Sequence, residues 1–516
     1  MTDYLKLQNG SDIRGVAIAI PGGKPVDLTE ESVTGIGASF ACFAAARLGC
    51  NIRTLRIAIG RDSRLSGPQL TEWLIKGITS TGASAFDAGM ASTPAMFMCC
   101  VNELRFDAGI MVTASHLPME RNGMKFFLGV PEGAEEAIGG LEKQDIKAIL
   151  TRAAAGEFPE ASPGKAEKTD VMTPYIEGLK RNILSGLGCG AGERPFESMR
   201  IVVDAGNGAG GFFAERLLLP LGADISGSRF LEPDGRFPNH QPNPENAEAM
   251  QSIVEAVETT GADLGIIFDT DVDRAGAVLP TENGALPLDR NRLIALMAAI
   301  LKNEYGPITV VTDSITSTGL TDFIEGLGCR HHRFKRGYRN VINEAKRLSA
   351  EGENAIFAME TSGHGALKEN YYLDDGAYII VKLLIEFVRA RRRGETLGGL
   401  IAGLAEPEES SEVRLPVLGE DFAAYTEGVL EAVEAYFGDK PGFTVVKPNY
   451  EGVRIGADAA HGDGWFLIRR SLHDPLMPVN LESNSRGGVK RLAAALTEAL
   501  AGFGLLDRSG LEKIAE

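Results

Sequence analysis

The stretch IVVDAGNGAGG, residues 201–211, indicates the fold class through its order of residue types. Its apolar start predicts a strand buried on both faces, its small polar residues predict a turn, and an amphipathic segment then runs to the glycine of LGAD, residues 221–224. The same order recurs in RIAIGRDSRLSG, residues 56–67, and in ITVVTDSITSTG, residues 308–319. A unit of strand, helix and strand used three times predicts three related α/β domains.

The last part of the chain follows a different pattern. Beyond GGLIAGLAEPEESSE, residues 398–412, the strand-like runs TVVKP at 444–448 and WFLIRRS at 465–471 precede a final helix, expected from Gly488 to about Leu506. This change predicts a smaller α+β domain at the end of the chain.

Two stretches suggest where the domains separate. AAAGEFPEASPGKAEK, residues 153–168, has the Ala, Gly, Pro and charge content typical of a linker. PTENGALP, residues 280–287, is either a second boundary or a hairpin within one domain. We expect four domains, at residues 1–170, 171–285, 286–405 and 406–516.

The composition favours a cytoplasmic enzyme. Among 516 residues, 52 Lys and Arg stand against 70 Asp and Glu, and the net charge of −18 disfavours nucleic acid and anionic membranes as partners. The start of the sequence does not resemble a secretory signal, and no stretch approaches the ~18 apolar residues of a membrane span. The six cysteines are scattered without the spacing of a zinc site or a disulfide framework. A monomer and a homodimer are both compatible with the sequence.

The segment VTASHLPMERNGMKFF, residues 112–127, places Ser115 in a turn beside His116 and ahead of Lys125. A serine hydroxyl acts as a nucleophile or phosphoryl carrier when a neighbouring group moves its proton, and a histidine or a lysine can do this. The alternative is a polar loop without a chemical role.

Three carboxylates follow the strand-like run LGIIF. Asp269, Asp271 and Asp273 alternate in DTDVDR, and side chains at alternate positions of an extended segment point the same way. Such a set of hard oxygen ligands suits Mg²⁺. A calcium loop is excluded because Arg274 and Pro280 replace its required Gly and Glu. A structural acidic turn is the alternative.

Two further segments carry polar groups suited to a sugar phosphate. Glu360, Ser362 and His364 alternate in ETSGH, ahead of an Asp374-Asp375-Gly turn, and this set can grasp vicinal hydroxyls. Arg469, Ser471 and His473 lie in a turn that can clamp a phosphate. Further loop cations are Arg14, Arg61, Arg64, Lys335 and Arg336. All of these groups could equally be surface or fold-anchoring residues.

Taken in this order, the motifs resemble those of the α-D-phosphohexomutases, the family of phosphomannomutase, phosphoglucomutase and phosphoglucosamine mutase. The resemblance spans essentially the whole chain, from SDIRG at residues 11–15 to the C-terminal phosphate loop. It implies an α/β fold of four domains around a central cleft. Three related mixed α/β domains would carry, in turn, the phosphoserine, the metal and the sugar-binding loop, and a smaller C-terminal α+β domain would bind phosphate.

The resemblance also implies roles for individual residues. Ser115 would carry the phosphoryl group and, with Asp269, Asp271 and Asp273, would hold one Mg²⁺ per subunit. Phosphate-contacting and proton-handling groups would be Arg14, His116, Lys125 and Arg274. Groups binding the phosphosugar would be Lys335, Gly337, Glu360, Ser362, His364, Arg469, Ser471 and His473.

The implied reaction interconverts hexose 1-phosphate and hexose 6-phosphate, of mannose, glucose or both. Phosphorylated Ser115 gives its group to the sugar, and the bisphosphorylated sugar turns over and returns its other phosphate. A sugar bisphosphate of the glucose 1,6-bisphosphate type would serve as activator. Lys125 and His116 both remain candidates for the general acid/base. Leu472 and His473 depart from the usual phosphate loop.

Three other readings stay open. Phosphoglucosamine mutase is the alternative within the family. A haloacid-dehalogenase-type phosphatase would use Asp269 as nucleophile and Asp271 as acid/base, with Asp374 and Asp375 as metal ligands. A sugar-phosphate-binding homologue without turnover is the third.

Overall fold

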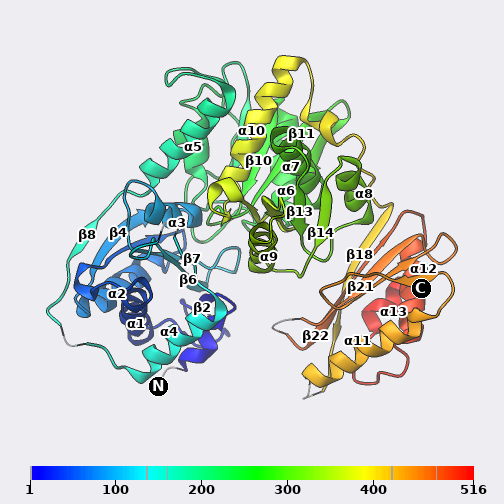
Figure 1. Cartoon of the computed structure of the whole chain (residues 1–516), viewed down its shortest axis with the longest axis horizontal. Coiled ribbons are helices and arrows are strands. Elements are labelled where there is room, and N and C mark those ends of the chain that lie inside the picture. Colours follow the sequence, from blue (N-terminus) through cyan, green and yellow to red (C-terminus); the bar gives the residue numbers. More distant parts are fainter. Residues whose placement is uncertain (1–2, 135–136, 160, 420–421, 472–473) are drawn as a thin grey trace. The chain divides into compact units, whose positions relative to one another are not determined.

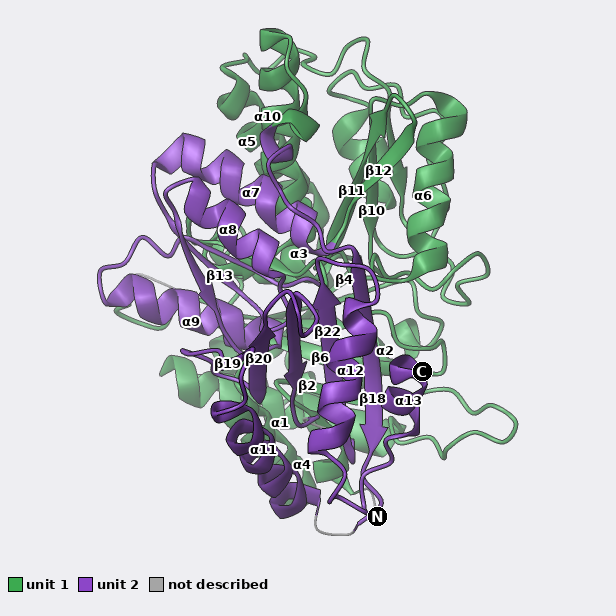
Figure 2. Ribbon diagram, turned by 90° about the vertical axis from the view of Figure 1, so that its right-hand side faces the viewer, with its two compact units in different colours: residues 1–289, 362–399 green, residues 290–361, 400–516 purple. Residues whose placement is uncertain are grey.

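The computed structural model (Figure 1) describes residues 3–134, 137–159, 161–419, 422–471 and 474–516. Leu472 and His473, singled out in the phosphate loop, lie outside the described residues. The chain divides into two compact units (Figure 2): residues 1–289 with 362–399, and residues 290–361 with 400–516. In the described residues no helix combines the length and the apolar character that crossing a membrane requires.

The first sheet of unit 1 is mixed. Its strands follow the order β1-β2-β6-β5-β3-β4-β8, with β7 paired to β6, and β3 runs parallel to both β4 and β5. The strands are β1 (Gln8–Asn9), β2 (Asp12–Val16), β3 (Arg56–Arg61), β4 (Ser84–Met90), β5 (Ala108–Val112), β6 (Arg121–Leu128), β7 (Gly139–Gly140) and β8 (Ala166–Lys168). The helices are η1 (Tyr4–Leu7), α1 (Glu30–Leu48), η2 (Ile52–Thr54), α2 (Gly67–Ser80), α3 (Thr93–Val101) and α4 (Lys143–Ala155).

Local signals explain where the first helices begin and end. Helix α1 starts at Thr29, whose side chain accepts from the Ser32 amide in a capping box, and it ends at Gly49, whose φ of 70° ordinary side chains rarely adopt. Its apolar face joins the core of the first sheet, where the rings of Phe40 and Phe126 lie 4.6 Å apart.

The expected linker is partly structured. Helix α4 continues to Ala155, and residues 166–168 form strand β8, which pairs in parallel with residues 85–87 of β4. All three residues of β8 are exposed, so no apolar alternation marks this edge strand in the sequence.

The second sheet of unit 1 has the order β12-β11-β10-β9. Its strands are β9 (Ile201–Asp204), β10 (Leu264–Phe268), β11 (Ala275–Thr281) and β12 (Gly284–Leu288), and its helices are α5 (Met172–Leu187), the π-helix η3 (Phe213–Leu218) and α6 (Ala247–Thr260). Residues 280–287 form the β11–β12 hairpin, the second of the two interpretations offered for this stretch. The helix predicted after β9 is the short π-helix.

Residues 362–399 complete unit 1. They contain β16 (Gly365–Leu367), η4 (Lys368–Asn370), β17 (Leu373–Asp374), α10 (Gly376–Arg393) and the start of η5 (Leu397–Ile401). Helix α10 lies beside α5 (Figure 1), and Arg389 donates to the carbonyl of Gly186 at 2.7 Å. The Tyr175 hydroxyl on α5 donates to Asp375, the residue that caps α10, at 2.8 Å.

Unit 2 contains a parallel sheet and an antiparallel one. In the parallel sheet, β13 (Thr309–Thr312) lies between β14 (Arg330–Arg333) and β15 (Phe357–Met359), with helices α7 (Arg290–Tyr305), α8 (Thr318–Gly326) and α9 (Tyr338–Ala350). The order β13-α8-β14 is the third of the predicted strand-helix-strand units.

The C-terminal domain of unit 2 is α+β, as expected. Its antiparallel sheet has the order β18-β22-β21-β20-β19, and Phe437 and Phe466 are fully buried in its core. The strands are β18 (Glu409–Pro416), β19 (Phe443–Val445), β20 (Val453–Ala457), β21 (Gly464–Ile468) and β22 (Leu476–Ser483), with helices α11 (Phe422–Gly438), α12 (Gly488–Ala499) and α13 (Ser509–Ala515).

Candidate active site

Ser115 lies in the loop that follows strand β5, and its backbone is left-handed. Its φ is 49°, a conformation that non-glycine residues seldom adopt. The Ser115 amide donates to the Thr113 hydroxyl at 2.9 Å, which helps to fix this turn. Strain of this kind persists only where the surroundings hold the backbone in place.

The buried guanidinium of Arg64 holds the backbone around Ser115 in place. It donates to the carbonyl oxygens of Ser115, Leu117, Pro118 and Arg121, at 2.8 Å for Pro118 and 2.9 Å for Arg121. Its Nε lies 3.4 Å from Asp62, and the Arg64 side chain has no exposed surface. One buried side chain therefore binds backbone carbonyls along the loop between β5 and β6, residues 113–120, which we call the serine loop, and at Arg121, the first residue of β6.

The three predicted aspartates lie together after strand β10. They occupy a turn rather than an extended strand, because β10 ends at Phe268 and Val272 has a φ of 68°. Their side chains still converge, with one oxygen of each within 4.8 Å of the others, and all three are buried. The turn, and not the alternation of a strand, brings these carboxylates together.

Ser115 is surrounded by groups from this turn and from its own loop. Its hydroxyl donates to Asp269 Oδ2 at 3.0 Å, and Arg274 Nη2 donates to the same hydroxyl at 3.2 Å. The ring Nδ1 of His116 lies 3.3 Å from the Ser115 Oγ and 2.6 Å from Arg274 Nη2. Burial and the Arg274 charge lower the pKa of His116 to about 3, so its ring is neutral at pH 7.

Lys125 from strand β6 contacts the other two carboxylates. Its Nζ lies 3.0 Å from Asp271 Oδ2 and also pairs with Asp273 Oδ2. Thr93 donates to Asp271 Oδ2 at 2.5 Å, which the sequence had not suggested. Despite its burial, the positive charges of Lys125 and of its neighbours lower the pKa of Asp273.

The carboxylates also have capacity for a metal ion. Asp271 Oδ1 and Asp273 Oδ1 are buried and have no hydrogen-bond partner among the described residues. Unpartnered buried carboxylate oxygens are costly, and a hard divalent cation satisfies them. The donor set of three carboxylates therefore fits such an ion.

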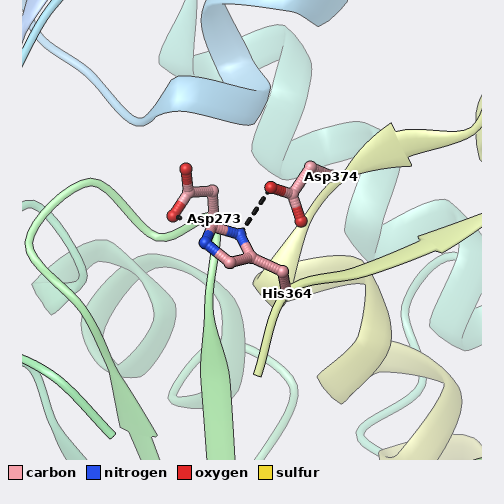
Figure 3. Close-up of side chains that lie close together, drawn as sticks. All are labelled: Asp273, His364 and Asp374. Atoms are coloured by element: carbon pink, nitrogen blue, oxygen red, sulfur yellow. Dashed lines mark hydrogen bonds and ion pairs between the residues drawn. The ribbon is translucent and has the colours of Figure 1, made fainter. Parts of the chain in front are cut away.

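His364 lies beside this turn and is oriented by Asp374 (Figure 3). Its Nδ1 is 2.6 Å from Asp374 Oδ2 and 3.9 Å from Asp273 Oδ1. Burial disfavours the charged ring, but the nearby carboxylates raise the pKa of His364 above its ordinary value. Asp375, the other acidic residue of that turn, instead caps helix α10 and accepts from Tyr378 N at 2.9 Å.

Arg14, on strand β2, contacts the start of the serine loop. Its guanidinium donates to the Thr113 carbonyl at 2.6 Å and pairs with Asp12 at 2.8 Å. Unit 1 thus brings together nine of the predicted residues: Arg14, Ser115, His116, Lys125, Asp269, Asp271, Asp273, Arg274 and His364. Ser362 is buried in the same unit.

The remaining described residues of the predicted site lie in unit 2. Glu360 accepts from the Gly337 amide at 2.5 Å, while Lys335 lies 5.9 Å above the Phe334 ring. Arg469 is buried, and its Nε has no hydrogen-bond partner among the described residues. The Ser471 hydroxyl accepts from the Asp474 amide at 3.3 Å.

Sequence reasoning missed Asp313 in unit 2. It follows strand β13 and accepts from the Thr361 hydroxyl at 2.8 Å, next to Glu360. Burial and the Glu360 charge raise the pKa of Asp313 to about 7. Its place directly after a buried strand, like that of Asp269, is the one sequence signal that could have found it.

This fold and site define an α/β enzyme in which a serine hydroxyl is held beside clustered carboxylates and cations, an arrangement suited to phosphoryl transfer. The family models of phosphoglucomutase/phosphomannomutase α/β/α domains I, II and III match residues 5–154, 173–283 and 289–406. The chain belongs to the phosphoglucomutase/phosphomannomutase family, and the predicted family is confirmed.

Individual relatives agree with this membership. A phosphomannomutase/phosphoglucomutase of Pseudomonas putida is 30% identical over 438 residues, 85% of each chain. A phosphoglucomutase of Neisseria gonorrhoeae is 30% identical over 482 residues, 93% of this chain and 94% of its own. The crystal structure of a phosphoglucomutase/phosphomannomutase family protein from Burkholderia thailandensis superposes with a TM-score of 0.77 at 27% identity, covering 98% and 100% of the two chains.

Proposed function

We propose that this enzyme interconverts hexose 1-phosphate and hexose 6-phosphate through a phosphoserine at position 115. The single observation that carries the proposal is the contact of the Ser115 hydroxyl with Asp269, at 3.0 Å, and with Arg274, at 3.2 Å. A carboxylate that accepts the hydroxyl hydrogen and a guanidinium that can stabilise phosphate oxygens are what a serine phosphoryl carrier needs.

Positively charged side chains lie beside the serine loop and beside the carboxylates. Arg274 and Arg14 face the serine loop, and Lys125 neutralises Asp271 and Asp273. Mg²⁺, which Asp269, Asp271 and Asp273 would hold together with phosphoserine, would offset charge on the transferring oxygens when bound. The donor set and the two unpartnered oxygens support one such ion per subunit.

The proton steps involve two different groups. His116, whose Nδ1 lies 3.3 Å from the Ser115 Oγ, is the proposed acceptor of the hydroxyl proton when phosphate returns to the serine. Its pKa of about 3 makes it a weak base for this step. Lys125, which pairs with Asp271 and Asp273, is the proposed acid that donates a proton to a substrate oxygen. A bisphosphorylated sugar connects the two half-reactions, and a compound such as glucose 1,6-bisphosphate would load Ser115.

The remaining predicted residues would bind the phosphosugar substrate. Glu360 and Ser362 bind sugar hydroxyls, and the phosphate and its charge are bound by Lys335, Gly337, His364, Arg469, Ser471 and His473. The proposed domains remain residues 1–170, 171–285, 286–405 and 406–516, and three family matches within the first 406 residues support this division.

Relatives named for mannose and glucose favour those sugars over glucosamine. The phosphatase alternative loses support, because Asp375, one of its two metal carboxylates, caps a helix and accepts from Tyr175. The retained serine and aspartates argue against a homologue without turnover.

Intact-protein mass spectrometry tests the proposal. After incubation with glucose 1,6-bisphosphate and Mg²⁺, the wild type should gain one phosphate of about 80 Da, a group that adds a charge of about −2. Ser115→Ala should gain none and should lose mutase activity on a panel of 1-phosphosugars. Phosphate on both proteins, or on neither, would overturn the role of Ser115.

A further inference from the structure

The loop of residues 240–246 links the second sheet of unit 1 to the serine loop. It carries the sequence HQPNPEN, has no helix or strand, and ends at Asn246, which caps helix α6 by accepting from the Ala249 amide at 3.0 Å. Its prolines fix two backbone φ angles, and both are buried. The two prolines therefore restrict the backbone conformations that this loop can adopt.

One end of the loop is pinned by His240. Its Nε2 lies 3.1 Å from both oxygens of Asp204, and its Nδ1 lies 3.0 Å from the carbonyl of Gln241. Both ring nitrogens thus face oxygen atoms. Burial disfavours the charged ring, but Asp204 and the Gln241 carbonyl raise the pKa of His240 above its ordinary value. Asp204 is itself fixed at the end of β9, because Ser252 donates to it at 2.7 Å.

The backbone after strand β9 also lies close to this loop, at Gly206. Gly206 has a φ of 52°, and a methyl group there would lie 2.8 Å from Pro242 Cβ and 3.3 Å from His240 Cε1. Only glycine allows the loop to rest on the end of strand β9 in this way.

The other end of the loop contacts the neighbours of Ser115. The Gln241 amide donates to the His116 carbonyl at 2.8 Å, and its own oxygen accepts from Asn246, which orients the amide. Arg274 Nη1 lies 3.4 Å from Asn243 Oδ1 and 3.7 Å from Glu245 Oε2. The loop thus contacts the His116 backbone and the Arg274 side chain, and both of these residues flank the serine hydroxyl.

We propose that His240 and Gln241 are positioning residues for phosphoryl transfer: pinned by Asp204, they hold the His116 backbone in place, and the same loop holds the Arg274 guanidinium against Ser115. Neither residue touches the reacting atoms. This inference rests on the proposed function, because a positioned hydroxyl matters only if Ser115 carries phosphate. Displacements of about 1 Å at a reacting group can slow a step by about 100-fold.

The reverse possibility is that the loop only stabilises the fold. The two roles differ in what they change, since a structural anchor alters melting temperature whereas a positioning residue alters the transfer rate of a folded enzyme. Gln241 separates them well because its side chain is exposed and makes its described contacts only with His116 and Asn246.

The test uses the full chain carrying Gln241→Glu, which replaces the amide donor with a carboxylate facing the His116 carbonyl. The matched control is Gln251→Glu, the same change on helix α6, where the side chain donates to Glu255 at 3.4 Å. Phosphorylated enzyme is mixed with glucose 1-phosphate, and the loss of phosphate from Ser115 is followed by rapid quench. KM and the melting temperature are measured in parallel.

We expect Gln241→Glu to transfer phosphate about 10- to 100-fold more slowly, with an unchanged KM and melting temperature, and Gln251→Glu to match the wild type. His240→Gln replaces the two ring nitrogens with a single amide donor group, and it should also slow phosphate transfer. A wild-type transfer rate in Gln241→Glu overturns the inference while the proposed function stands, and so does a slower rate that accompanies a large loss of stability. A wild type that never becomes phosphorylated overturns both.

Discussion

The hydroxyl of Ser115 donates a hydrogen bond to Asp269 across 154 residues of sequence, at 3.0 Å between Oγ and Oδ2. The contact joins a loop of the first sheet to a turn of the second. Burial and the neighbouring Asp273 and Asp271 raise the pKa of Asp269, so this carboxyl lies in a crowded anionic environment. A phosphoryl group on Ser115 would add charge at the same place, and cations must then balance it.

Replacing Asp269 by Asn keeps the shape of the side chain but removes one anion from the carboxylate cluster. We expect phosphorylation of Ser115 to fall by about 100-fold or more, as when a preorganised group at a reacting centre is lost. The Mg²⁺ concentration needed for half-maximal activity should rise. Intact-protein mass spectrometry measures the first effect and magnesium titrations of activity measure the second, with exposed Asp439→Asn as the control. An unchanged magnesium requirement would contradict the metal role of Asp269.

Removing the charge of Lys125 should make the fold depend on a divalent cation. Lys125→Met leaves Asp271 and Asp273 without their ammonium partner, and breaking a buried ion pair costs about 3–5 kcal/mol. Added Mg²⁺ should restore the melting temperature, because a ligand that binds only the folded state stabilises it. Lys76→Met breaks an exposed pair with Glu30 and should cost at most about 1 kcal/mol. Instability that Mg²⁺ does not relieve would argue against a cation site.

Arg64→Lys should impair the serine loop more than its conservative chemistry suggests. A single ammonium cannot replace a planar fork that serves four carbonyl oxygens. We expect a loss of stability of about 1–3 kcal/mol for each buried carbonyl left unpaired, together with slower phosphorylation of Ser115. Thermal denaturation and mass spectrometry measure the two effects, and exposed Arg53→Lys is the control. Normal stability with normal phosphorylation would show that Arg64 is dispensable.

Asp313 should make the stability of unit 2 fall as pH rises. The pKa of Asp313 is raised to about 7 by burial and by Glu360, whereas an unfolded aspartate ionises near pH 4. Between these values the folded state binds more protons than the unfolded state, so stability declines from about pH 4 to about pH 7. Asp313→Asn removes this titration.

Urea denaturation of both proteins at pH 5, 6 and 7 measures the difference. Relative to the wild type, the free energy of unfolding of Asp313→Asn should rise by roughly 1.4 kcal/mol per pH unit between pH 4 and pH 7. A difference that does not change with pH would show that Asp313 titrates normally.

Much of the fold could be predicted because repeated strand-helix-strand order is a local signal. The parallel pairs β3–β4 and β13–β14 follow directly from it, and so does the α+β character of the C-terminal part. Strand β8 could not be predicted, since its three exposed residues carry no apolar pattern. The π-helix at Phe213–Leu218 could not be predicted either, because π-helices are rare and the expected amphipathic segment indicates an ordinary helix.

The site shows a similar division. Ser115 and the aspartates could be found because each follows a buried strand and carries chemistry in its own short motif. The roles of Thr93 and His240 could not, because each depends on contacts with residues far away in the sequence, such as the 178 residues between Thr93 and Asp271. The convergence of the aspartates was predicted for the wrong reason, since the positive φ of Val272 and the turn create it.

The left-handed backbone at residue 115 restricts which hydroxyl amino acid can occupy this position. Threonine offers the same hydroxyl, but its branched Cβ strongly disfavours a φ of 49°. The shape of the main chain at residue 115 therefore favours serine over threonine, whatever the reactivity of the two hydroxyl groups.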